Sequence, residues 1–130
     1  MEKLIKKLSE AAQTAAENAH SPFSNYPVGA AVVSESGEIY KGCNVESSSY
    51  GLSVCAERNA LAAAIVDGAR DFKALAIYSK NGATPCGACR QVIWDICGPI
   101  PVYSIDKNNK ITKYSSQKLL PEPFGANKLE

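Results

Sequence analysis

The sequence predicts an α/β fold, in which helices pack on the faces of a mixed β-sheet. In the middle of the chain, helical and strand-like patterns alternate, as they do where helices cross over between parallel strands. On either side of this region, short β-rich runs flank turn residues, as in antiparallel hairpins. A chain of 130 residues, 45% of them hydrophobic, is large enough for one core but small for two. We therefore expect a single domain spanning residues 1–130.

The N-terminal part is predicted to form a helix followed by a hairpin. Its apolar residues recur at steps of three and four, which is typical of an amphipathic helix. They are Leu4, Ile5, Leu8, Ala11, Ala12, Ala15, Ala16 and Ala19. Ser21-Pro22 is expected to end this helix. Two β-rich runs follow, at residues 28–34 and 39–44, and residues 35–38 between them are predicted to form the turn.

The middle of the chain is predicted to hold two helices around a buried strand. After a serine-rich loop, helical character extends from Cys55 to about Asp67, and Gly68 is well placed to end it. Residues 74–79 are predicted to form the strand. The second helix is expected from about residue 87 to residue 97.

The C-terminal part is predicted to form a second hairpin. Its strands are residues 102–105 and 111–114, and Asn108-Asn109 lies at the turn. Residues 116–120 are expected to add one helical turn before Pro121. The order is then α-β-β-α-β-α-β-β-α, with parallel pairing where the helical crossovers occur.

The charge of the chain argues against a nucleic-acid partner. Its 14 basic and 13 acidic residues give a formal net charge of +1, so it has no excess of positive charge to neutralise phosphates. The charged N-terminus lacks the apolar run of a signal peptide, and no stretch approaches the roughly 18 apolar residues of a membrane span. We expect a cytoplasmic protein with no membrane partner. Disulfides are rare in the cytosol, so its five cysteines are interpreted as metal ligands or buried small residues.

Three of the cysteines lie at predicted helix starts. Cys86 and Cys89 form a C-x-x-C pair after Pro85, and Cys55 opens a helix 31 positions before Cys86 (86 − 55). First-turn side chains tilt toward the helix N-terminus, so two facing helix starts can bring three sulfurs to one point. The partial positive charge there favours the thiolate form. Three thiolates suit Zn²⁺ and leave its fourth tetrahedral position open for water, which is the mark of a catalytic site.

Glu57 lies two residues after Cys55. In a first turn both side chains can project beyond the helix end, so this carboxylate can carry protons between a zinc-bound water and a substrate. A Cys-x-Glu segment with Pro-Cys-x-x-Cys is the known motif of zinc deaminases, in which the glutamate is the general acid and base. A C-x-x-C pair alone also fits a redox pair or half of a structural zinc site. The joint pattern favours deaminase chemistry.

The other conspicuous residues have simpler interpretations. Cys43 ends a strand and Cys97 ends a helix, so both are interpreted as packing residues. Trp94 and Tyr103 are assigned to core packing. His20, the only histidine, lies at a helix end and is interpreted as a capping or surface residue.

Together these motifs resemble the cytidine deaminase family, specifically its short, three-cysteine, homotetrameric branch. The resemblance covers nearly the whole chain and is carried by several segments in the family's order, at residues 23–31, 42–46, 50–51, 55–58, 85–92 and 119–124. It implies a three-layer α-β-α architecture with a mixed five-stranded sheet. It also implies zinc-dependent hydrolytic deamination of cytidine and deoxycytidine to uridine and deoxyuridine, with release of ammonia, in pyrimidine salvage.

The resemblance also implies the roles of the metal-site residues. Zn²⁺ is the cofactor, Cys55, Cys86 and Cys89 bind it, and Glu57 is the proton shuttle. Arg58 matches an arginine that donates to thiolate sulfur in the family. Three thiolates make the metal a poorer Lewis acid, and a guanidinium beside them restores part of its electrophilicity.

Further residues are assigned to the nucleoside by the same resemblance. Asn44 and Glu46 would bind the ribose hydroxyls, for which an amide and an ionised carboxylate have suitable donors and acceptors. The backbone amide of Ala56 would contact the pyrimidine carbonyl.

Four aromatic residues match positions around the base. Phe23 and Tyr26 would enclose it, although the family more often carries Phe where this chain has Tyr26. Tyr50 and Phe124 match residues that reach into a neighbouring subunit's site. The resemblance thus implies a homotetramer whose active sites are completed across interfaces.

Three alternatives remain open. A relative could act on another aminated pyrimidine, such as a blasticidin-type nucleoside antibiotic, but that branch generally alters the 44–46 segment. Polynucleotide editing is disfavoured by the neutral charge and the short chain. A structural zinc module serving as a binding domain would need a fourth ligand and would leave Glu57 unexplained.

Overall fold

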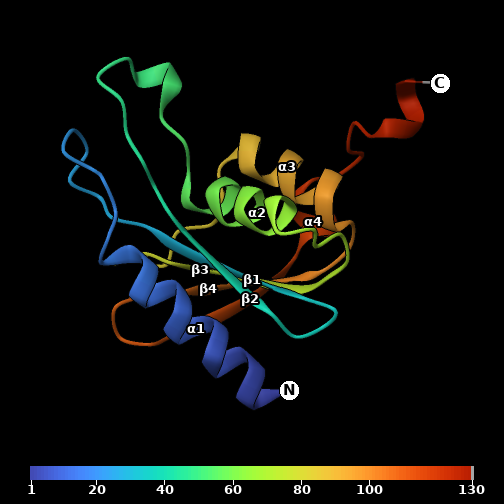
Figure 1. Cartoon of the computed structure of the whole chain (residues 1–130), viewed down its shortest axis with the longest axis horizontal. Coiled ribbons are helices and arrows are strands. Elements are labelled where there is room, and N and C mark those ends of the chain that lie inside the picture. Colours follow the sequence, from blue (N-terminus) through green and yellow to red (C-terminus); the bar gives the residue numbers. More distant parts are fainter. Residues whose placement is uncertain (130) are drawn as a thin grey trace.

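The sheet of the protein is mixed and five-stranded, in a computed structural model that describes residues 1–129 (Figure 1). The strands are β1 (Gly29–Ser34), β2 (Ile39–Cys43), β3 (Phe72–Tyr78), β4 (Pro101–Ile105) and β5 (Ile111–Ser115). Their spatial order is β2-β1-β3-β4-β5. Neighbours β3 and β4 are parallel, and the other neighbouring pairs are antiparallel. The predicted mixed sheet is confirmed.

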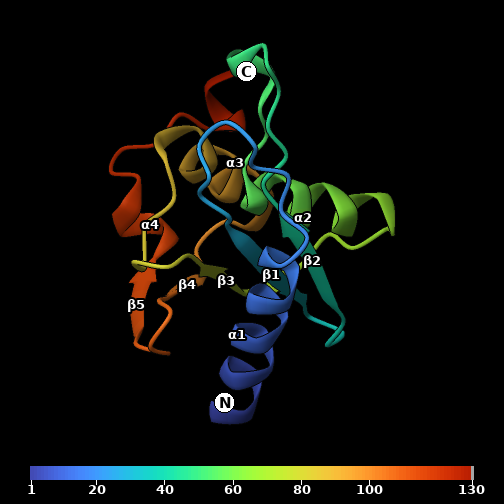
Figure 2. The same ribbon diagram turned by 90° about the vertical axis from the view of Figure 1, so that its left-hand side faces the viewer.

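Helices cover both faces of this sheet. They are α1 (Glu2–Ala16), α2 (Ala56–Val66), α3 (Gly87–Cys97) and α4 (Ser116–Leu119), with 3₁₀ turns η1 (Tyr50–Leu52) and η2 (Ala126–Leu129). Figures 1 and 2 show α1 on one face and α2 and α3 on the other. This confirms the three-layer α-β-α architecture. Within residues 1–129, no helix combines the length and the apolarity needed to cross a membrane.

The core is divided by the pleat of the central strands. All six residues of β1 are buried, because this strand has neighbours on both sides and helices on both faces. Ala30 and Val32 pack in the cluster below α2 and α3, whereas Ala31 and Val33 pack with Leu8 of α1. This alternation is expected for a strand with two buried faces.

Two glycines allow the helices to approach the sheet closely. A Cβ atom on Gly29 would lie 1.9 Å from the carbonyl oxygen of Ala12 in α1. A Cβ atom on Gly42 would lie 2.5 Å from the carbonyl oxygen of Ala56, at the start of α2. Only glycine fits at such contacts. The second contact holds the first turn of α2, and with it Cys55, against the sheet.

Most element boundaries lie within a residue of the prediction, and the larger differences are two boundaries and one additional element. Helix α1 ends at Ala16 instead of near Ser21, because the backbone of His20 pairs with the segment around Val45. Strand β3 begins at Phe72, which pairs with Ser34 beyond a register shift. The serine-rich loop contains the 3₁₀ turn η1, which was not predicted.

Candidate functional site

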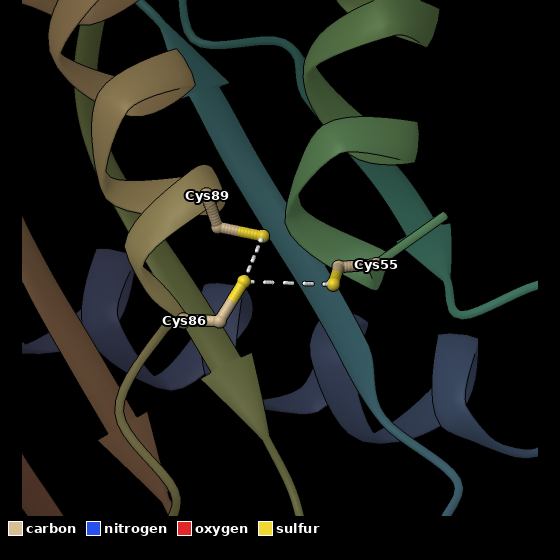
Figure 3. Close-up of side chains that lie close together, drawn as sticks. All are labelled: Cys55, Cys86 and Cys89. Atoms are coloured by element: carbon tan, nitrogen blue, oxygen red, sulfur yellow. Dashed lines mark hydrogen bonds between the residues drawn. The ribbon is translucent and has the colours of Figure 1, made fainter. Parts of the chain in front are cut away.

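Three cysteine sulfurs meet where α2 and α3 begin (Figure 3). Cys55 is the N-cap of α2, Cys86 is the N-cap of α3, and Cys89 lies in the first turn of α3. The Sγ atom of Cys86 lies 3.9 Å from that of Cys55 and 3.5 Å from that of Cys89. The two helix starts therefore face one another, as their sequence predicts. We call this group the sulfur centre.

The sulfur centre fits a zinc ion. Tetrahedral zinc with Zn–S bonds of about 2.3 Å places its sulfurs about 3.8 Å apart. The three sulfurs lie within 4.8 Å of one another, and all five cysteines are free. No fourth histidine, cysteine or carboxylate from residues 1–129 joins this cluster. The residues present thus leave room for a ligand that the protein does not supply.

Arg58 lies beside the sulfurs. Its Nη2 atom donates to Sγ of Cys55 over 3.6 Å, and its buried Nε atom has no hydrogen-bond partner within the described chain. Hydrogen bonds from Cys89 and Arg58 lower the pKa of the Cys55 thiol, whereas the pKa of Cys89 is raised by its bond to Cys55 and by burial. A cationic donor therefore accompanies the thiolate, where the family resemblance implied one.

Glu57 is the buried carboxyl group of the site. It lies in the first turn of α2 and is only 4% exposed. Burial raises the pKa of its carboxyl group, and the nearby negative charge of Cys55 acts in the same direction. Such a group holds a proton at higher pH than an exposed glutamate does, which suits it to accept and return protons.

The helix starts also offer backbone donors. Neither Cys55 nor Cys86 caps its helix through the side chain, so first-turn N–H groups are left for another acceptor. Ala56 provides one of them at the first position of α2. Ala56 is also fully buried and belongs to the hydrophobic core.

Asn44 holds the loop that precedes β1. Its Oδ1 atom accepts from the backbone N–H of Val28 at 2.9 Å, and its Nδ2 atom donates to the carbonyl of Tyr26 at 3.0 Å. One amide hydrogen and one lone pair remain for a ligand. The family resemblance assigns Asn44 to a ligand, and its role in holding this loop was not predicted.

Glu46 holds the same loop further upstream. Its Oε1 atom accepts from the backbone N–H groups of Phe23 (3.0 Å) and Ser24 (3.1 Å), and its Oε2 atom accepts from the Ser24 hydroxyl. The Ser24 hydroxyl bond is the main reason that the pKa of Glu46 is lowered. Glu46 is therefore ionised and already positioned, with acceptor capacity left on its carboxylate.

A cavity of about 310 Å³ lies next to these loops, lined by Phe23, Ser24, Glu46, Tyr50 and Ser53. The rings of Phe23 and Tyr50 meet edge to face with centroids 5.9 Å apart. This volume is in the range of small-molecule sites. Ser24 and Ser53 were not predicted, since serine in a loop carries no distinctive pattern. A larger cavity of about 550 Å³, between α1 and the β4–β5 hairpin, contains no residue of the sulfur centre.

Two of the predicted aromatic residues lie outside this cavity. Tyr26 donates its hydroxyl to Asn81, and Lys80 lies over its ring at 5.6 Å. Phe124 lines a separate cavity of about 320 Å³ with Trp94, which is only half-buried. We refer to Phe23, Tyr50 and Phe124, which are all exposed, as the aromatic rim.

The residues interpreted as structural lie away from the sulfur centre. Cys97 packs against the core, where burial raises the pKa of its thiol to about 12. Tyr103 is buried in the α1 cluster. Cys43 ends β2, and its carbonyl accepts from Asn59 at 2.8 Å. The side chain of His20 is exposed, but its backbone bonds to the 44–46 segment, which was not foreseen.

Comparison with known proteins identifies the relatives of this chain. Residues 2–103 match the family model for the cytidine and deoxycytidylate deaminase zinc-binding region. The cytidine deaminase of Sporosarcina psychrophila is 46% identical over 123 residues, which cover 92% of this chain and 90% of that protein. A crystal structure of cytidine deaminase from Burkholderia pseudomallei matches with a TM-score of 0.89 and 42% identity, covering 92% of this chain and 98% of that one. A blasticidin-S deaminase of Bacillus cereus is 30% identical over 110 residues, covering 77% of this chain and 78% of that protein.

Proposed function

The chain belongs to the cytidine and deoxycytidylate deaminase family, and on that basis we propose that it hydrolyses cytidine and deoxycytidine to uridine and deoxyuridine with release of ammonia. The observation that carries the proposal is the sulfur centre with a buried carboxyl group beside it. The centre offers three protein ligands to a metal, which would leave a position for water. A structural zinc module would need that position closed.

The residues have distinct tasks in this reaction. Zn²⁺ held by Cys55, Cys86 and Cys89 would supply a water molecule whose pKa is lowered toward about 7. Glu57 accepts a proton from the water and delivers it to N3 of the pyrimidine, which makes C4 electrophilic. The hydroxide so formed would add to C4. Glu57 would then take the proton of the new C4 hydroxyl and pass it to the amino group, so that the C4–N bond breaks, a C4 carbonyl forms and ammonia leaves. Arg58 draws charge from the thiolate of Cys55.

The nucleoside would bind between the loops and the helix starts. The remaining hydrogen-bonding capacity of Asn44 and Glu46 suits the ribose hydroxyls. The Ala56 amide is assigned to the pyrimidine carbonyl, and Phe23 and Tyr26 to the base. The hydroxyl of Tyr26, which is bonded to Asn81, is this chain's departure from the family's usual Phe.

We further propose that the working unit is a homotetramer in the cytoplasm. Tyr50 and Leu52 are 75% and 71% exposed, and Phe124 is 56% exposed. In Figure 1 the segment around η1 and the C-terminal segment both rise from the sheet on the side of α2 and α3. Exposed apolar residues at such positions favour contact with other copies. Five free thiols suit the reducing cytoplasm. Gel filtration should give four times the chain mass of 13.8 kDa.

One assay tests the proposed activity. Zinc-loaded protein is mixed separately with cytidine, deoxycytidine and blasticidin S, and the loss of ultraviolet absorbance is followed. We expect turnover of both pyrimidine nucleosides and much slower turnover of blasticidin S. Blasticidin S is included as a substrate because the chain is also similar to a blasticidin-S deaminase. Turnover of blasticidin S alone, or no turnover by a fully loaded protein, would refute the proposal.

A further inference from the structure

Two side chains that directly follow Cys89 hold the C-terminal segment, defined as residues 119–129. The Nη1 atom of Arg90 donates to the carbonyl of Leu119 at 3.1 Å. The Nε2 atom of Gln91 donates to the carbonyl of Phe124 at 2.7 Å. Neither side chain has a task in the proposed reaction, so these contacts need another explanation.

Arg90 joins the C-terminal segment to the residues before Cys86. Its Nε atom donates to the carbonyl of Pro85 at 2.7 Å, and its Nη2 atom donates to the hydroxyl of Thr84 at 3.2 Å. A guanidinium presents its donors in a rigid planar fork. While these bonds hold, Leu119 cannot move independently of the backbone that places the Cys86 sulfur.

The C-terminal segment has few other attachments. Within the described chain, residues 121–129 hydrogen-bond to the rest of the molecule only through Gln91. Figure 1 shows this segment leaving the body of the fold beyond α3 and α4. Trp94 lies next to this segment, since it lines a cavity together with Phe124, Gly125 and Asn127. The position of Phe124 therefore depends on Gln91.

We propose that Arg90 and Gln91 are positioning residues that couple metal binding at the sulfur centre to the placement of Phe124. Zinc bound by Cys86 and Cys89 fixes the start of α3, and the two side chains transmit that position to the C-terminal segment. The inference rests on the proposed function, which assigns Phe124 to the nucleoside site of a neighbouring copy. Gln91 then affects substrate binding in that copy without touching substrate.

The structural part of the inference is tested without an activity assay. Trp94 is the only tryptophan, so its emission reports on the C-terminal segment. The rate of trypsin cleavage after the exposed Lys118 reports on the hydrogen bond that Arg90 donates to the carbonyl of Leu119. On adding zinc to the metal-free protein, we expect the Trp94 emission to shift and the rate of cleavage after Lys118 to fall about fivefold. A change of this size corresponds to stabilising one or two hydrogen bonds, here those that Arg90 and Gln91 donate to the C-terminal segment.

Variants separate Gln91 from a general effect of zinc. Gln91→Met keeps the side-chain length but removes the donor, so it should bind zinc and lose the emission shift. Gln91→Lys restores a donor and should restore the shift. Gln13→Met is the matched control, because it removes a similar bond of 2.9 Å, to Asn109, far from the site. It should behave as the unchanged protein. Arg90→Lys, which keeps the charge but loses the fork, should raise the rate of cleavage after Lys118.

The kinetic part of the test asks whether KM changes while kcat does not. Gln91→Met should raise KM for cytidine about fivefold while kcat stays the same, and Gln91→Lys should reverse this. An unchanged KM, or a zinc-loaded protein whose emission and cleavage match the metal-free protein, overturns the inference. Failure of the unchanged protein to bind zinc or deaminate cytidine instead refutes the proposed function.

Discussion

The sulfur centre and the aromatic rim are held by the fold in opposite ways. Cys89 and Glu57 are 0% and 4% exposed, on helices that pack into the core, while Cys55 is half-buried and Cys86 is exposed at its helix start. Phe23, Tyr50 and Phe124 are 49%, 75% and 56% exposed. The groups assigned to chemistry are thus positioned by the core before any ligand arrives, whereas the groups assigned to recognition are left for substrate and neighbouring copies to cover. Pre-organised groups lower the barrier of a reaction, and a surface completed on binding contributes to affinity.

The largest contrast is expected among the thiols themselves. Iodoacetamide attacks thiolates, and hydrogen bonds from Cys89 and Arg58 lower the pKa of Cys55. Burial without such donors raises the pKa of Cys97 to about 12, which leaves about one thiolate in 10⁵ at pH 7. In chelator-treated protein at pH 7, peptide mapping should find Cys55 modified and Cys97 not modified.

The pH dependence of this labelling has a defined sign. Because its pKa is raised, Cys97 gains thiolate only as pH increases, so its labelling rate should rise about tenfold per pH unit toward pH 12. Cys55, with a lowered pKa, should react at lower pH than an ordinary thiol. Reloading with zinc should protect Cys55. Equal labelling of both residues at pH 7 would contradict the contrast.

The next largest effect should follow removal of a metal ligand. Cys86→Ala should reduce zinc from about one ion per chain to near zero and abolish deamination, because two sulfurs do not complete the site. Cys43→Ala is the matched control, since Cys43 lies at the end of β2 outside the sulfur centre. Metal analysis of both variants decides the matter. Equal zinc loss in both would mean that cysteine packing, not ligation, is being measured.

Glu57→Gln tests the buried carboxyl group separately from the metal. The amide has the same shape but cannot carry the proton, so kcat should fall about 10³-fold while zinc content is unchanged. Glu10→Gln, an exposed change on α1, should leave kcat unaltered. Near-normal turnover by a metal-loaded Glu57→Gln protein would remove Glu57 from the mechanism.

The same contrast explains what the sequence could predict. Helix α3 matches its predicted bounds of 87–97, because Gly98 follows the helix as a strong local end signal. The sulfur centre was predictable because helix starts impose a direction on their side chains. The helix end is a local signal, whereas the sulfur centre joins two helix starts 31 positions apart and was predictable because each start carries its own short motif.

The loop contacts could not be predicted in this way. Asn44 bonds to Val28, and Glu46 bonds to Phe23, across 16 and 23 positions. Their partners are backbone groups, which no residue pattern marks. The early end of α1 has a similar cause, since the alanine periodicity continues to Ala19 while the backbone of His20 is engaged by the 44–46 segment. Tertiary contacts there override a local helix preference.

A smaller effect is expected at the edge of the sulfur centre. Arg58→Gln removes the cation beside Cys55 and should lower kcat about 10- to 100-fold, as changes in the partners of metal ligands commonly do. Zinc should remain bound, because the three sulfurs are intact. Arg70→Gln, which alters an arginine bonded only to backbone carbonyls at the far end of α2, is the control. An Arg58→Gln enzyme with unchanged kcat would refute the role of Arg58.

A still smaller effect than that of Arg58 is expected at the aromatic rim. Tyr50 is 75% exposed, and its ring meets that of Phe23 edge to face. Tyr50→Ala therefore removes little buried surface from the single chain and should cost it little stability. If the rim serves recognition, KM for cytidine should rise about tenfold with kcat nearly constant, because the lost contact is made equally in substrate and transition state. Val66→Ala is the control, because Val66 is also an exposed apolar residue (88%) but lies at the end of α2. It should change neither KM nor kcat. A fall in kcat with unchanged KM would show that Tyr50 acts on the chemistry, and the division between a pre-organised centre and a recognition rim would then fail at Tyr50.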